Sequence, residues 1–293
     1  MKLRPVPSYL ASMMRIFLFA GLLFYSSAAV AQDSLWVITE AWFQGEDSLM
    51  GTRFELTPEW TGHNAVIDRA EDQISSIVLI NTDTVDHVFS TNAPEAESIM
   101  LEAGASTNVA LPAMPQGSFR YFLSDERGKV LGGSGMIRTG WTDETLFYWN
   151  LSDWDPIRTL DAAAGMPIDF DAPYVPRFFT VNEESYPSTS DDPNALVAVS
   201  LGDTSFIAIA NHGFMDHVLH FHGFHVIMVS STGYPERVGW NKDTVPIRRG
   251  ESLTVRLIAY QEGMYPVHNH NLIAVTNAGF YPGGMITTIH VMP

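Results

Sequence analysis

The sequence contains no cysteine among its 293 residues. This absence excludes disulfides, thiolate metal sites and thiol nucleophiles. The chain must therefore rely on its hydrophobic core for stability, and about 260 residues beyond the N-terminal segment are enough for two domains of ordinary size.

Basic residues are also scarce. The chain has 16 Lys and Arg against 33 Asp and Glu, which gives a formal net charge of −17 at pH 7. A polyanionic surface argues against nucleic acid and anionic membranes as partners. The simplest interpretation is a soluble protein, although an acidic surface also concentrates cations and thus agrees with metal binding.

Long apolar runs are absent after the N-terminus. Residues 16–25 form an apolar run that follows Lys2, Arg4 and Arg15 and precedes the small-residue site 29–31. This order predicts a cleaved signal over 1–31, with a periplasmic or secreted mature chain. The run is too short to span a bilayer, so we expect no membrane span after cleavage. Met13 and Met14 are alternative start sites, since the sequence from either one still reads as a complete signal.

The remaining sequence consists of short segments rich in Val, Ile, Thr and aromatic residues, separated by turns. They lie at 76–80, 107–111, 118–123, 195–199, 205–210, 220–229, 252–259 and 285–291. This pattern predicts an all-β fold of paired antiparallel sheets. Segment 142–173 is rich in Asp, Pro and Ala, and we interpret it as an interdomain connection with one helical turn. Domain 1 would then cover 32–141 and domain 2 would cover 174–293.

Six of the ten histidines fall into two short segments, 217–225 and 268–270. In a strand, residues i and i+2 point to the same face, so His220 projects with His222, and His268 with His270. Four imidazoles around one point would suit copper, with zinc as the competitor. A single pair would more often be surface or packed histidines, but two pairs are harder to explain by packing. His63, His212 and His290 stand alone, and we expect structural or surface roles for them.

These residues lie in motifs that resemble those of the multicopper oxidases. His217-Val-Leu-His220-Phe-His222-Gly resembles the family's H-P-x-H-L-H-G, residues 240–245 (WNKDTV) resemble its W-x-x-D-T-V, and residues 263–270 (GMYPVHNH) resemble its G-x-W-x-x-H-C-H. The resemblance implies two cupredoxin-like Greek-key β-sandwich domains, the first one degenerate. It implies a type 2 copper ligand at His220, type 3 ligands at His222, His268 and His270, and a type 1 ligand at His217.

The chain departs from the family at the type 1 position. Asn269 stands where the family has its cysteine, Ala274 stands where a second histidine is expected, and Met285 comes late, after a six-residue insertion. A blue copper site needs the thiolate, so the usual entry of electrons from an organic donor is not available. Whether His217 or Met285 binds metal without the cysteine stays open.

In domain 1 we align residues 81–91 with the family's H-W-H-G segment. On that alignment His87 keeps one type 2 ligand, while Phe89 and Ser90 replace the second histidine and the glycine. Phe122 and Ser124 replace the two histidines of the later segment. Asp243 resembles a residue near the family's copper region and is a candidate to orient a histidine, with a turn role as the alternative.

The sequence is consistent with two functions, which belong to different classes of protein. The first is a copper-dependent oxidoreductase with a mononuclear or dinuclear histidine site that meets a small-molecule or metal-ion substrate. The second is a copper-holding or interaction protein without turnover. The resemblance also implies a homotrimer, because two-domain members of the family often share ligands between subunits.

Overall fold

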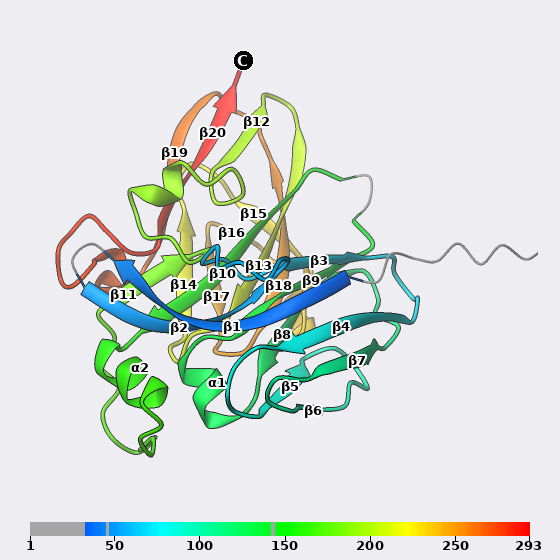
Figure 1. Ribbon diagram of the computed structural model, residues 1–293. Helices are drawn as coiled ribbons and strands as arrows, with labels where there is room; N and C mark the ends of the chain where they lie inside the picture. Colours follow the sequence, from blue (N-terminus) through cyan, green and yellow to red (C-terminus); the bar gives the residue numbers. More distant parts are fainter. Residues whose placement is uncertain (1–32, 45–46, 142–143) are drawn as a thin grey trace, which may run out of the picture. The chain divides into compact units, whose positions relative to one another are not determined.

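The computed structural model describes residues 33–44, 47–141 and 144–293, and residues 32–293 form one compact unit. The expected signal over 1–31 lies outside the described residues. No helix in the described part of the chain has the length and apolar character that crossing a membrane requires. The fold is built from four sheets that pair into two β-sandwiches (Figure 1), which confirms the all-β expectation.

The first sandwich is formed by two sheets around one core. One sheet has the order β2-β1-β4-β7 and the other has the order β3-β9-β8-β5-β6. The two sheets pack face to face because side chains alternate between the inward and outward faces of each strand. In β4, for example, the side chains of Ile77, Leu79 and Asn81 point inward. The elements are β1 (Asp33–Gln44), β2 (Asp47–Glu55), β3 (Val66–Arg69), β4 (Ser75–Asn81), β5 (His87–Thr91), β6 (Ile99–Leu101), β7 (Ser106–Leu111), β8 (Gly117–Leu123), α1 (Glu126–Val130) and β9 (Ser134–Thr139).

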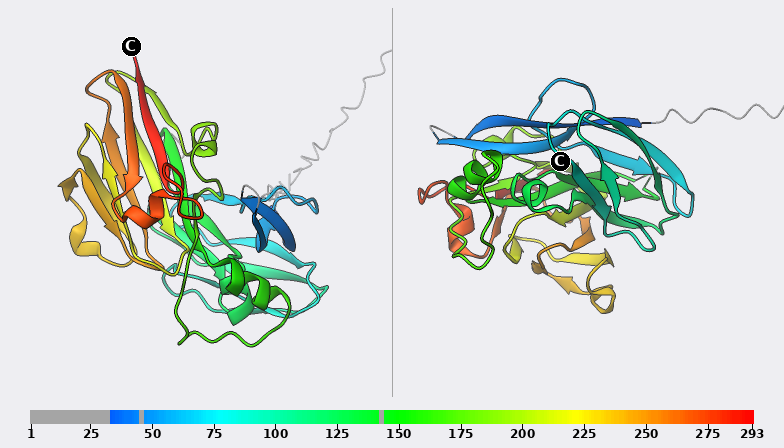
Figure 2. Two further views of the ribbon diagram at one scale, coloured as in Figure 1. Left: turned by 90° about the vertical axis from the view of Figure 1, so that its left-hand side faces the viewer. Right: turned by 60° about the horizontal axis from the view of Figure 1, so that its bottom comes forward.

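The second sandwich has the sheets β11-β10-β13-β18-β15-β16 and β12-β20-β19-β14-β17. Figure 2 shows its yellow-to-red strands apart from the blue and cyan strands of the first sandwich. Its elements are β10 (Leu146–Trp154), α2 (Pro156–Ala163), β11 (Phe178–Val181), η1 (Ser188–Ser190), β12 (Val197–Ser200), β13 (Thr204–Asn211), β14 (His217–Phe221), β15 (Val226–Ser231), η2 (Pro235–Arg237), β16 (Asn241–Lys242), β17 (Thr244–Ile247), β18 (Ser252–Ile258), β19 (Gly263–Asn269), η3 (Leu272–Val275) and β20 (Ile286–Met292).

Segment 142–173 is more than a connection. It contains β10, which pairs in parallel with β13 and lies inside the second sandwich. The side chains of Trp149 and Leu151 are fully buried in that core. Helix α2 follows, capped by Asp155, with Pro156 in its first turn where a missing N–H is tolerated. The Asp, Pro and Ala content that indicated a connection belongs to α2 and the loop after it.

The two sandwiches repeat one topology. Strands β2, β1, β4 and β7 correspond in order to β11, β10, β13 and β18, and β3, β9, β8, β5 and β6 correspond to β12, β20, β19, β14 and β17. The parallel pairs also match: β1–β4 with β10–β13, and β3–β9 with β12–β20. The fold is therefore duplicated, and the residues of these nine strand pairs can be compared position by position, whereas β15 and β16 occur only in the second sandwich.

The first sandwich docks through β8 on strands β13, β15 and β18 of the second. Ser118 Oγ lies 2.7 Å from Thr254 Oγ1, and Asn92 donates from Nδ2 to Thr232 Oγ1 at 3.1 Å. The outward face of one sheet in the first domain is thus covered within the chain.

Candidate metal centre

Strands β14 and β19 bring four histidines together on one outward face of the second sandwich. The two strands are antiparallel, and His220 faces His268 directly across the pair. The ring centroids of His220 and His222 are 4.6 Å apart, those of His222 and His268 are 5.1 Å apart, and that of His270 lies 5.8 Å from that of His220. We call His220, His222, His268 and His270 the histidine group.

Backbone and ring contacts fix the tautomers in this group. Nδ1 of His268 lies 2.9 Å from the carbonyl oxygen of Asn269, so Nδ1 carries the proton and donates it. Nε2 of His268 then carries a lone pair and no proton, and it lies 3.0 Å from Nε2 of His222. Burial, and then the neighbouring His220 and His268, lower the pKa of His222 and favour the neutral ring that a metal requires.

The donors of the histidine group fit a nitrogen-liganded metal ion. Two nitrogens bound to one ion at about 2.0 Å each, near a right angle, stand about 3 Å apart. The Nε2 atoms of His222 and His268 already have this spacing. Within the described residues, however, no three His, Cys, Asp or Glu side chains converge as a finished site. Binding a third nitrogen therefore requires rotation of His220 or His270.

Thr244 also contacts the histidine group. Its Oγ1 lies 3.1 Å from Nδ1 of His220. Asp243, the residue proposed for this role, instead accepts the backbone N–H of Phe221 with its own carbonyl oxygen at 2.7 Å. Among the described residues no side-chain hydrogen bond joins Asp243 to a histidine. The W-x-x-D-T-V segment thus reaches the group through its threonine.

Behind the histidine group, the inward side of β19 holds a second constellation. Asn269 points into the core between the outward His268 and His270, as strand alternation requires. Its Nδ2 donates to Nδ1 of His217 at 2.8 Å and lies 3.3 Å from Sδ of Met285. The late Met285 therefore does reach the type 1 position, despite the six-residue insertion.

This inner position does not fit a metal. Its donors are one imidazole and one thioether, and both already accept hydrogen bonds from the Asn269 amide. Ala274 is fully buried and offers no ligand atom. Because Nδ1 of His217 accepts a bond, its proton is on Nε2, which donates to Asp153 Oδ2 at 3.1 Å. An amide-centred hydrogen-bond network thus occupies the place of a type 1 copper.

Asp153 closes this network from β10 and was not found by the sequence analysis. Its buried carboxylate also accepts bonds from Tyr174 Oη and from the backbone N–H groups of Phe214 and Met215. Burial raises the pKa of Asp153, but the hydrogen bonds from His217, Tyr174 and Phe214 outweigh it and lower the pKa overall. Nothing in its sequence context signals this role, because Asp153 lies in the segment interpreted as a connection.

His87 lies in a different cluster, in the first sandwich. It is fully buried, with Nδ1 3.3 Å from Asp125 and Nε2 3.3 Å from Asp83. Its counterpart in the duplicated fold is His217, since each is the first residue of its strand, β5 or β14. Asn81 and Asn211 make the same bonds before them, to the carbonyl oxygens of Val85 and Met215.

This register changes the expected alignment of domain 1. The counterparts of His220 and His222 are Ser90 and Asn92, and the counterparts of His268 and His270 are Phe122 and Ser124. The first sandwich therefore keeps no residue of the histidine group. His87 is the counterpart of a type 1 position, and its two nitrogens are occupied by carboxylates.

The other histidines stay apart from the group. His63 bonds the carbonyl oxygen of Asn182 through Nδ1, and its pKa is raised to about 9, chiefly by Glu183. His212 lies between Arg120 and Asn150. His225 is exposed, and His290 is half-buried in β20.

Replacing Asn269 with cysteine tests the inner position. Copper-loaded wild-type protein should lack an intense thiolate-to-copper absorption band, because the chain has no thiolate. The Asn269→Cys variant should gain such a band, since the new sulfur would lie beside His217 and Met285. The control is Asn241→Cys, an exposed position in β16, and visible spectra decide. A variant as colourless as the control would contradict the assignment of this position.

Comparisons with family models and with solved structures found proteins of similar fold. Residues 166–282 match the family described as multicopper oxidase. The blue copper oxidase from Nitrosomonas europaea superposes with a TM-score of 0.72 at 21% identity, over 88% of this chain and 85% of that chain. The copper nitrite reductase from Nitrosomonas europaea superposes with a TM-score of 0.66 at 17% identity, over 89% and 93%. These likenesses establish the fold, and no curated protein matches the sequence.

Proposed function

Because residues 166–282 of this chain belong to the multicopper oxidase family, we propose that the protein is an exported, copper-binding oxidoreductase whose copper is held by histidines alone. The observation that carries the proposal is the contact between Nε2 of His222 and Nε2 of His268, with Nδ1 of His268 held by a backbone carbonyl. A carbonyl bond on the far ring nitrogen is the usual way in which proteins orient a metal-binding imidazole.

Copper is the proposed ion because all-nitrogen sites bind it most tightly among divalent first-row metals, with zinc as the competitor. Bound copper would supply a redox change and a coordination position open to a small molecule or metal-ion substrate. The chain itself would contribute three things: the ring nitrogens of the histidine group, the Thr244 contact that orients His220, and an inner network that carries no metal.

The alternative function is copper holding without turnover. The filled inner position favours it, because Asn269 occupies the site through which an organic donor would pass electrons. The two functions differ in a simple assay. Oxygen uptake or nitrite reduction by the copper-loaded chain, with phenols or reduced metal ions as donors, would support the oxidoreductase, and bound copper without any turnover would support holding.

Copper affinity is expected to depend on the histidine group. His222→Ala and His268→Ala should each weaken copper binding about 10-fold or more, as is typical when metal-site residues are lost. His225→Ala and His290→Ala are the controls, since one is exposed on the same segment and the other lies in β20 away from the rings. Calorimetric titration, with zinc in parallel, measures the affinities. Equal copper affinity in all four variants would contradict the site.

We also propose a homotrimer, by analogy with two-domain members of the family. In each chain the outward face of β8 docks on the second sandwich, whereas the equivalent face of β19 carries the histidine group and an exposed Met264. A partner copy could cover this face as β8 is covered within the chain. Light scattering of the purified protein measures the molar mass, and a monomer at micromolar concentration would contradict the assembly.

Export to the periplasm or medium remains part of the proposal. It is supported by the order of positive residues, apolar run and small-residue site over 1–31. N-terminal sequencing of the secreted chain should begin at Gln32, and an intact N-terminus would contradict cleavage.

A further inference from the structure

A cavity of about 640 Å³ lies where the two sandwiches meet. Its volume is in the range typical of small-molecule sites. It opens beside Phe122, the first-sandwich counterpart of His268, so it occupies the duplicated equivalent of the metal face. The cavity is independent of the histidine group, because none of the four group members lines it.

The walls of this cavity are cationic, in contrast to the rest of the chain. Four basic side chains line it, from β8, α1, α2 and the loop before β18, against the single carboxylate of Glu126: Arg120, Lys129, Arg158 and Arg249. The whole sequence has twice as many acidic as basic residues. A local excess of positive charge in a concave, partly dehydrated site raises the local concentration of anions.

Arg120 has no acidic partner among the described residues of the cavity wall. Its Nε donates to Nδ1 of His212 at 3.2 Å, and Nε2 of His212 donates in turn to Oδ1 of Asn150 at 3.0 Å, so its side-chain partner is neutral. Burial and the charge of Arg120 hold the pKa of His212 well below its usual value. Among the described residues no salt bridge to Arg120 is found, and desolvation lowers the pKa of its guanidinium to about 10. Arg120 is half-buried at the cavity wall, and a partly desolvated cation without a counter-charge favours a ligand that supplies one.

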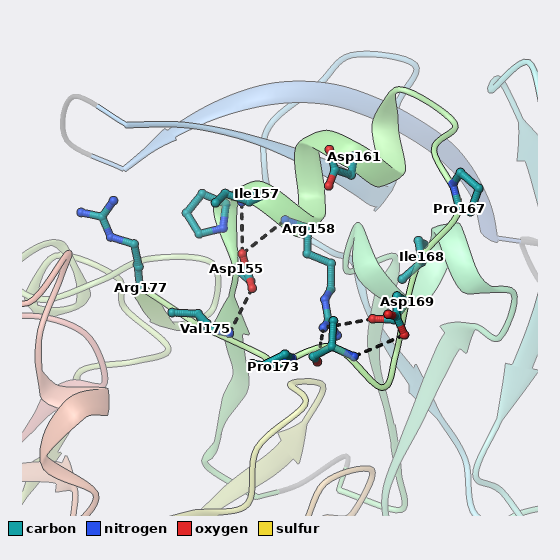
Figure 3. A pocket seen from close by; sticks show the side chains of 12 residues that line it. Asp155, Ile157, Arg158, Asp161, Pro167, Ile168, Asp169, Pro173, Val175 and Arg177 are labelled. Atoms are coloured by element: carbon teal, nitrogen blue, oxygen red, sulfur yellow. Dashed lines mark hydrogen bonds between the residues drawn. The ribbon is translucent and has the colours of Figure 1, made fainter.

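Aromatic rings flank the cationic groups. The guanidinium of Arg120 lies 4.6 Å from the ring centroid of Phe122, and that of Arg158 lies 5.1 Å from the ring of Tyr174. Figure 3, which draws a different pocket that shares Arg158 with this cavity, shows Arg158 reaching from α2 to the loop around Asp169. The carbonyl oxygens of Asp169 and Ala172 accept from its Nη2. Stacked and anchored guanidinium groups present their donors in a fixed plane, which suits the planar oxygen pair of a carboxylate.

We propose that this cavity binds a small aromatic carboxylate. The carboxylate would pair with Arg120 and Arg249, and its ring would lie against the aromatic walls formed by Phe122, Phe170 and Phe214. The face of the first sandwich that corresponds to the histidine group would then carry an anion site.

Benzoate is the probe, titrated into the intact mature chain by calorimetry, with benzamide and inorganic phosphate as comparison ligands. Benzoate should bind, and benzamide, which has the same ring without the charge, should bind at least about 10-fold more weakly because a charge-assisted hydrogen bond is lost. Phosphate should also bind more weakly, since it lacks the ring. Equal binding of benzamide would overturn the anionic part of the proposal, and tighter binding of phosphate would overturn the aromatic part.

Neighbouring arginines provide the matched variants. Arg249→Ala should weaken benzoate binding several-fold, whereas Arg248→Ala should not, because Arg248 pairs with Asp216 and does not line the cavity. Arg120→Met should abolish binding, and because it also removes the donor to Nδ1 of His212, the unfolding midpoint of the ligand-free variant is measured alongside. If Arg120→Met does not fold, the Arg249 and Arg248 pair decides. Equal benzoate affinity in that pair would overturn the site.

Discussion

Replacing Asp153 with alanine is expected to lower the free energy of unfolding by several kcal/mol, because each buried donor left without an acceptor costs about 1–3 kcal/mol. The side chain of Asp153 is completely buried and accepts bonds from Tyr174, Phe214, Met215 and His217. Alanine would leave these donors without acceptors in a site that water does not reach. Denaturant unfolding followed by tryptophan fluorescence measures the change.

Asp216 provides the control for this experiment. It immediately precedes β14, and both side chains of its ion pair with Arg248 are about half exposed. Exposed pairs contribute little to stability, so Asp216→Ala should shift the unfolding midpoint far less than Asp153→Ala. Asp153→Asn should fall between the two, since it keeps one acceptor oxygen. Equal midpoints for the two alanine variants would show that the network does not support the core.

Raising the pH from 6 to 10 is expected to remove about 3 kcal/mol of the stability that His87 gives the folded protein. Burial lowers the pKa of His87, but its bonds to Asp125 and Asp83 outweigh burial and raise the pKa to about 9. A histidine whose folded pKa lies above its unfolded value stabilises fully below about pH 6.5. That contribution is lost as the pH rises through the folded value.

The cluster of His87, Asp83 and Asp125 also loses stability in acid, because its two carboxylates become protonated. The pKa values of Asp83 and Asp125 are lowered by their bonds to His87, despite burial, so their contribution disappears as the pH falls. Unfolding free energies of wild type and His87→Gln, compared at pH 6, 8 and 10, isolate the histidine. His63→Gln is the control: its pKa is also about 9, but the side chain is half-exposed and should lose less. A pH-independent difference between wild type and His87→Gln would exclude a charged His87.

Much of the fold could be predicted from the sequence because strand alternation and turn residues are local signals. Segments such as 205–210 and 252–259 lie within or overlap strands β13 and β18. Strand β10 was missed because most of its C-terminal residues are buried on both sides, including polar ones such as Asn150 and Asp153. Burial on both faces removes the alternation by which a strand is recognised.

The site was predictable only in part. The His-x-His spacing gave the correct neighbours, because the two-residue period of a strand is a property of the backbone alone. The placement of His87 required the register of the duplicated fold, which Asn81 and Asn211 mark through equivalent hydrogen bonds. His217 forms hydrogen bonds with both Asp153 and Asn269, which lie on strands far apart in the sequence, and no local pattern predicts such contacts.

The amide of Asn269 has a consequence for how metal and folding are linked. In a protein whose core is completed by an ion, removing that ion loosens the whole domain. Here hydrogen bonds between the protein's own side chains already join the core, from Met285 through Asn269 and His217 to Asp153. If the histidine group binds copper as proposed, the ion can therefore enter and leave the outer face while the scaffold stays folded.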